Sequence, residues 1–220
     1  MSAGLSEADN QYFLGLYRCA VSEYQPKIEK RTGVALGDIA VRDFREIDND
    51  FMRDMERQRS SWLARLLWRS TIKSRLKQWR EHLSSTHAER ASACMACYVR
   101  DTIYVSFTPG LWNHEFGIAF AVVHELSHAL WERLAGEPLT RRTAVASDCE
   151  KFELFVEGFA TYAEFIWFLD AYPRSVQRTV EQALPTPGSV HYRGMKRIEQ
   201  IVQQNGQHVL LEIPKRWREL

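Results

Sequence analysis

The segment Ile118 to Leu130 constrains this chain most, because it is apolar at almost every position and yet carries two histidines and a glutamate. Its HELSH sequence puts His124 and His128 four residues apart, one above the other on the same face of a helix. Both imidazoles can therefore reach a single ion, and zinc accepts imidazole nitrogen readily. Glu125 would emerge beside a water molecule on that ion and could accept its proton. The alternative is a buried helix whose histidines are only hydrogen-bonded, which places costly polar groups in apolar surroundings.

The composition indicates one folded domain over residues 1–220. Hydrophobic residues make up 45% of the 220 positions, which is enough for one sizeable core. The net charge of +1 points to no particular partner, and nothing in the sequence indicates an oligomeric state. The chain shows neither a secretory signal nor an apolar run of membrane-spanning length, so we expect a cytoplasmic protein. Cys94 and Cys97 lack the second pair that a zinc ribbon needs and are expected to be small core residues.

The hydrophobic pattern predicts a mostly helical α+β protein with a small sheet. A helix is expected from Ser6 to about Lys30, which Pro26 could bend or end. Alternation over Asp38 to Phe44 predicts a strand, and Ala93 to Val99 with Thr102 to Phe107 predicts a β-hairpin. The histidine-bearing helix follows this hairpin, so the sheet is expected to lie on its N-terminal side.

Residues 45–90 are expected to form a basic helical insertion. Eight Arg or Lys residues and no acid lie between Arg57 and Arg80, interleaved with Trp, Leu and Ile. Such a helix could lie on an anionic membrane surface or follow a nucleic-acid backbone. It could equally be a solvated face whose long basic side chains cover a packed stripe. The pattern alone gives no firm evidence for nucleic acid or membrane.

A third metal ligand is expected from a second helix, predicted over Asp148 to Leu169. Glu157 stands out there because it sits in the most apolar part, FVEGFATYAEF, where an unpaired carboxylate is expensive. Gly158 and Ala160 would let this helix approach the histidine helix closely. Glu153 is the alternative ligand, since an error of one turn in the facing of the helix would exchange the two.

HELSH followed 29 residues later by EGFATYAEF resembles the gluzincin clan of zinc metallopeptidases. The resemblance covers roughly residues 93–206 and implies a zincin-like fold with a small sheet beside the HExxH helix. It implies one zinc ion on His124, His128 and Glu157, with Glu125 as the general base. Manganese, cobalt or iron in place of zinc stays open. The implied activity is hydrolysis of peptide bonds in a peptide or protein substrate.

The resemblance also suggests supporting parts. The segment Thr102 to Phe107 matches the edge strand along which such enzymes align a peptide. In this family a Tyr, His or Arg after the glutamate ligand commonly steadies the oxyanion. His191, Tyr192 and Arg193 lie in that region, and we favour Tyr192, although a tyrosine there could simply pack in the core. Thr161 stands where thermolysin-like members often have an acid that supports the first histidine. Glu164, two turns beyond Glu157, could orient an imidazole instead.

The sequence leaves two rival classes of function. A non-catalytic zincin-like protein could use its metal site only for structure or regulation. An interaction protein could bind nucleic acid or a membrane surface through the basic helix expected at 57–80.

Overall fold

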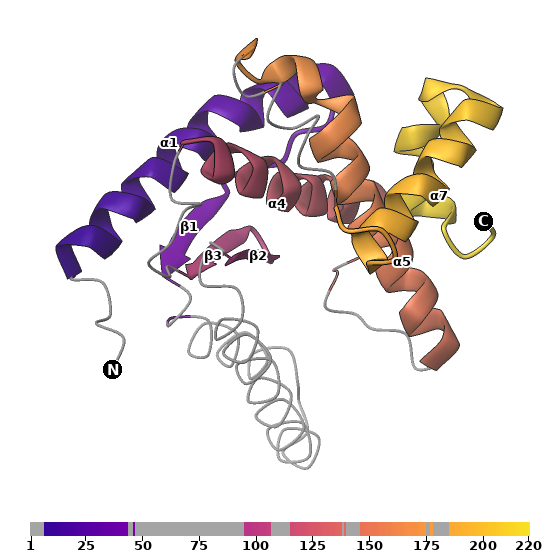
Figure 1. Ribbon diagram of the computed structural model, residues 1–220, viewed down its shortest axis with the longest axis horizontal. Helices are drawn as coiled ribbons and strands as arrows, with labels where there is room; N and C mark the ends of the chain where they lie inside the picture. The colour runs from indigo at the N-terminus through magenta and orange to yellow at the C-terminus, as the bar shows by residue number, and fades with distance from the viewer. Residues whose placement is uncertain are drawn as a thin grey trace.

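A computed structural model describes residues 7–43, 46, 95–106, 115–137, 139, 146–174, 177 and 185–220. Over these ranges the protein has the predicted α+β character, mostly helical with one three-stranded mixed sheet (Figure 1). The basic segment 57–80, with nearly all of the expected insertion at 45–90, lies outside the described residues. Within the described ranges, no helix combines the length and the apolar content needed to cross a membrane.

The N-terminal helix α1 spans Glu7–Thr32 and passes through Pro26 without ending. The expectation that Pro26 could end this helix is wrong. A proline removes one helical hydrogen bond, but Tyr24 and Ile28 on either side of it are buried in the core, and their burial favours continuation of the helix. The helix ends instead at Gly33, whose φ of 71° is readily adopted only by glycine.

The sheet contains β1 (Ala40–Asp43), β2 (Met95–Val99) and β3 (Thr102–Ser106). The predicted hairpin is confirmed, since β2 and β3 pair antiparallel around a tight turn at Arg100 and Asp101, both with positive φ.

The strand order β1-β3-β2 corrects one prediction. Residues 102–107 were expected to form an edge strand, but β3 is the central strand. The reason is that β1 pairs in parallel with its other side, with Ala40 opposite Thr102 and Asp43 opposite Val105. Among the described strands, the edge strand next to the histidine helix is β2, which lies against that helix.

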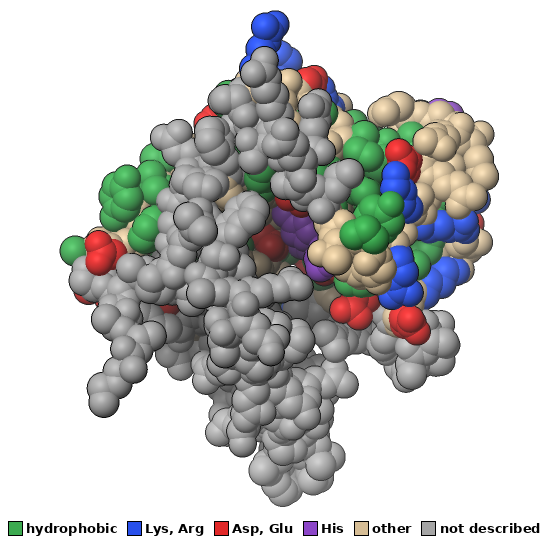
Figure 2. All heavy atoms as spheres, in the orientation of Figure 1, with side chains coloured by type: hydrophobic (Ala, Val, Ile, Leu, Met, Phe, Trp, Pro, Cys, Tyr) green, Lys and Arg blue, Asp and Glu red, His purple; other side chains and the backbone are tan. Residues whose placement is uncertain are grey.

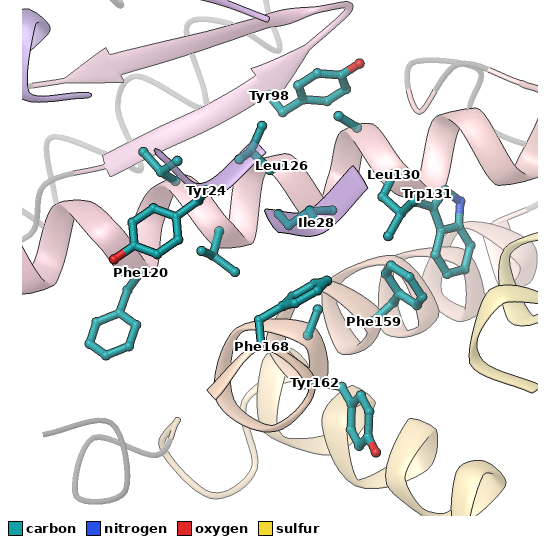
Figure 3. Packing of buried hydrophobic residues seen from close by; sticks show 14 of the residues in the cluster. Tyr24, Ile28, Tyr98, Phe120, Leu126, Leu130, Trp131, Phe159, Tyr162 and Phe168 are labelled. Atoms are coloured by element: carbon teal, nitrogen blue, oxygen red, sulfur yellow. The ribbon is translucent and has the colours of Figure 1, made fainter. Parts of the chain in front are cut away.

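The histidine helix α4, Glu115–Ala135, is the centre of the core. It packs against α1 and β2 and against the next helix. Figure 3 shows its side chains lying between the sheet, which carries Tyr98, and the helical segments that carry Phe159 and Phe168. Leu126, Leu130 and their apolar neighbours on this helix are buried, as the sequence predicted.

The second helix predicted over 148–169 is shorter and ends in an unusual turn. It is α5, Ala146–Tyr162, followed by a π-helical turn η2, Ala163–Trp167. The N–H of Phe168 donates to the carbonyl of Ala163 at 2.9 Å, five residues earlier. Such π turns are rare and often occur at functional sites.

Basic side chains of α1 hold the segment that follows this turn. The guanidinium of Arg31 pairs with both carboxylate oxygens of Asp170 in η3 (Leu169–Ala171). The ammonium of Lys27 donates to the carbonyl of Ala171 at 3.1 Å. Side chains of the N-terminal helix therefore stabilise the segment that directly follows the π turn.

The C-terminal helix α7, Val190–Asn205, crosses α5 at backbone contact. A Cβ added to Gly158 would lie 2.6 Å from the Cα of Gly194, and the reverse substitution meets the Cα of Gly158 at the same distance. Gly158 was expected to bring α5 close to α4, but the helix that it admits is α7. The chain then ends in η4 (Gln207–Leu211) and the short α8 (Ile213–Arg216).

This crossing predicts a large difference between two Gly→Ala substitutions. Gly158→Ala should destabilise the protein by about 1–3 kcal/mol, because the new methyl group forces two backbones apart. Gly15→Ala in α1 meets no atom within 4 Å and should stabilise by up to ~1 kcal/mol, since alanine favours a helix. Urea unfolding followed by circular dichroism measures both, and equal midpoints for the two variants would contradict the packing described.

Candidate metal centre

Two helices bring the three predicted ligands together. His124 and His128 stand one turn apart on α4, with ring centroids 4.8 Å apart and planes at 84°. Glu157 reaches them from α5, and one donor atom from each residue lies within 4.8 Å of the others. In Figure 2, histidine side chains are visible near the middle of the face shown, beside acidic ones. Glu153, the alternative ligand, is exposed to solvent.

The distances suit a tetrahedral ion. Oε2 of Glu157 lies 3.3 Å from Nε2 of His124 and 3.6 Å from Nε2 of His128. Tetrahedral zinc with bonds of about 2.0–2.2 Å separates its ligand atoms by about 3.3–3.5 Å. Two imidazoles and one carboxylate also form a known donor set for catalytic zinc. The two distances from the carboxylate to the imidazoles and the chemistry of the donor set therefore both suit a zinc ion.

His124 is held at both ring nitrogens. Its Nδ1 lies 3.0 Å from Oε2 of Glu164, which the π turn η2 presents to it. The expectation that Glu164 contacts an imidazole is confirmed. Thr161, at the position where an acid often stands, instead donates its hydroxyl to the backbone carbonyl of Glu157 at 2.7 Å. Nδ1 of His128 is buried and has no hydrogen-bond partner among the described residues, so the polar contact of this ring is the one from Nε2 to Glu157.

The buried carboxylate Glu125 points toward the sheet with one oxygen. Its Oε2 accepts the backbone N–H of Tyr98 in β2 at 2.6 Å. Burial raises the pKa of Glu125, and the nearby charges of His128 and His124 offset only part of this effect. A carboxylate with a raised pKa binds a proton more readily, as a general base requires.

The only cysteine described near this cluster is Cys97, which is free and lies on β2. Burial and the charge of Glu125 raise the pKa of its thiol well above the usual value. The thiol therefore favours its protonated form, and Cys97 is not part of the group of converging donor atoms. Cys94 lies outside the described residues.

The electrostatics of the cluster favour a cation. Burial raises the pKa of Glu157, but the charge of His128 and hydrogen bonds from the surrounding imidazoles outweigh it and hold that pKa well below its usual range. Burial lowers the pKa of His124, but hydrogen bonds to Glu157 and Glu164 raise it well above its usual range. With Glu125, three carboxylates meet here, and a divalent ion would compensate their charge.

A third imidazole reaches the cluster, and it belongs to His191, which the sequence suggested only as an alternative to Tyr192 for steadying an oxyanion. Nε2 of His191, in the first turn of α7, lies 3.3 Å from Oε2 of Glu157. Gly194 follows one turn later and faces α5. Because residues three apart share a face of a helix, the sequence could have indicated that His191 faces α5 as well. Tyr192 donates its backbone N–H to Ser189, and its ring lies 5.9 Å from the ammonium of Lys196. Its proposed role toward an oxyanion stays a prediction.

Comparisons of the chain with protein-family models, with curated proteins and with solved structures found no match. The functional interpretation therefore depends on the geometry and chemistry of the side chains themselves.

The cluster predicts which glutamate is needed for metal binding. Glu157→Ala should lose stoichiometric zinc, with affinity reduced by more than about 100-fold, because a direct ligand matters more than its supporting residues. Glu153→Ala, one turn earlier and exposed, should bind zinc like the unmodified protein. Competition with a chromophoric chelator gives both affinities, and zinc lost equally from both variants would contradict the assignment.

A smaller loss of metal affinity is expected when Glu164, which contacts Nδ1 of His124, is substituted. Glu164→Gln keeps the size of the side chain but removes its charge, so the metal affinity should fall by about 10- to 100-fold. Thermal unfolding in excess chelator provides the control, since it reports the effect of the substitution on the protein without zinc. An unchanged affinity would show that Glu164 does not support the ligand.

Proposed function

We propose that this protein is a zinc-dependent metallopeptidase of the gluzincin type with a zincin-like fold. One zinc ion would be held by His124, His128 and Glu157. The observation that supports this most is the carboxylate of Glu157, which meets both imidazoles of the HELSH helix at distances that suit tetrahedral zinc. Glu125, a buried carboxylate next to the first ligand, supplies the group that hydrolysis additionally requires.

The proposed chemistry divides between the ion and Glu125. Bound zinc would supply an acidified water molecule and a polarised substrate carbonyl. Glu125 is tied to the backbone of Tyr98 through Oε2, which leaves Oε1 for proton transfer. It would accept the proton of the attacking water and deliver it to the leaving amine. Tyr192 remains our candidate for the donor that steadies the oxyanion.

The outer edge of β2, which pairs with no described strand, supports a peptide as the substrate class. The N–H of Tyr98 points to Glu125 and hence away from β3. Because residues alternate along an antiparallel pair, the N–H and C=O of Ala96 also point outward. An extended peptide could pair with the N–H and C=O of Ala96 beside the metal ligands. The sequence suggested β3 as the strand that aligns a peptide, whereas we now propose β2 for this role.

Glu125→Gln tests the proposal. The variant should retain stoichiometric zinc, since Glu125 is not a ligand, but should lose hydrolytic rate by about 100- to 10,000-fold because the amide cannot carry the proton. A proteome-derived peptide library, with products read by mass spectrometry, serves as the substrate. Zinc content is measured on the same samples.

The control for this experiment is Glu153→Gln, a change of the same chemistry at an exposed position one turn from Glu157. It should keep both zinc and activity. If zinc is bound and Glu125→Gln cleaves as fast as the unmodified protein, the ion serves structure or regulation and the proposed mechanism is wrong.

A further inference from the structure

Three imidazoles, not two, surround the carboxylate of Glu157. Its Oε2 lies 3.3 Å from Nε2 of His124, 3.6 Å from Nε2 of His128 and 3.3 Å from Nε2 of His191. Ligands of a tetrahedral zinc ion are about 3.3–3.5 Å apart, so Glu157 lies at or near this distance from all three rings. The donor atoms that all lie within 4.8 Å of one another belong to His124, His128 and Glu157, and His191 adjoins this group through Glu157. The ring centroids of His124 and His191 are 5.8 Å apart, so the third ring also lies beside the first ligand.

The fold holds His191 in this place from two sides. Ser189 caps α7 by accepting the backbone N–H of Tyr192 at 3.1 Å, which fixes where the helix begins. The glycine contact between α5 and α7 involves Gly158, the residue next to Glu157, and Gly194, one turn after His191. The closest approach of the two helices therefore lies directly beside the pair that Glu157 and His191 form.

His191 differs from the other two histidines in its exposure. Its side chain is 46% exposed, whereas those of His124 and His128 are 14% and 9% exposed. The imidazoles of His124 and His128 project from the core helix α4 and are largely buried. The imidazole of His191 can swing into solvent by rotation of its own side chain.

We propose that His191 is a fourth, exchangeable metal ligand that closes the site until a peptide substrate displaces it. Closed four-ligand zinc sites are structural, whereas catalytic sites keep one position open. Displacement breaks one coordinate bond, and the neutral imidazole keeps its electron pair, so no oxidant, reductant or proton is required. The vacated position then becomes available to water. This inference rests on the proposed function and adds a latent state to the same site.

The test counts histidines on the metal in the full-length protein. X-ray absorption at the zinc edge reports how many imidazole rings scatter around the ion. We expect three rings in the unmodified protein and two in His191→Ala, with an affinity for zinc lower by at least about tenfold. His208→Ala, which alters an exposed histidine of η4, should keep three rings and full affinity.

Kinetics provide a second measurement. At saturating zinc His191→Ala should cleave the peptide library at least as fast as the unmodified protein, because its fourth position is already open. His191→Gln, which retains a polar side chain of similar reach, should behave in the same way and guards against misfolding of the alanine variant.

The outcomes are distinct. Two rings in the unmodified protein, or an unchanged zinc affinity in both His191 variants, would overturn the proposal. A slower variant with unchanged zinc affinity would overturn it as well and assign His191 to the substrate. Failure of the proposed function looks different, since the unmodified protein would then bind no zinc, or Glu157→Ala would bind it equally well.

Discussion

The rest of this structure depends on the contacts that Oε2 of Glu157 makes with three imidazoles. A carboxylate in apolar surroundings is stable only when compensating groups reach it. Here the compensation comes from imidazoles on α4 and α7, two helices far apart in the chain. Their positions follow from packing, because α4 is buried against the sheet and α7 meets α5 at two glycines. Core packing and site geometry are thus one arrangement.

Much of the fold and of the site could be predicted from the periodicity of apolar and polar residues along the sequence. His124 and His128 had to share a helical face because they stand four residues apart in an apolar segment, and α4 has both on one face. Glu157 was identified by the cost of placing its charge among apolar neighbours. The hairpin could be predicted because alternation and a two-residue turn are both short-range features.

Contacts between distant segments could not be predicted in this way. Nothing in the pattern of residues 38–44 reveals that this strand pairs with β3 and makes it central. Gly158 indicated a close helix contact but not its partner, because a missing side chain has no preferred direction. The contact of Glu164 with His124 was expected from its place two turns beyond Glu157, but the π turn that carries Glu164 was not, because a helical pattern does not record a single extra residue.

The register of the sheet has a consequence for how such a protein can diversify. Asp43 ends β1 opposite Val105, and Met95 begins β2 opposite Ser106, so the chain leaves and re-enters the sheet at the same end. Two strand spacings separate these points, about 10 Å, which a handful of residues can bridge. The fold thus sets almost no length requirement between them. A shorter or a longer segment at this junction is therefore compatible with the same pairing of β1, β2 and β3.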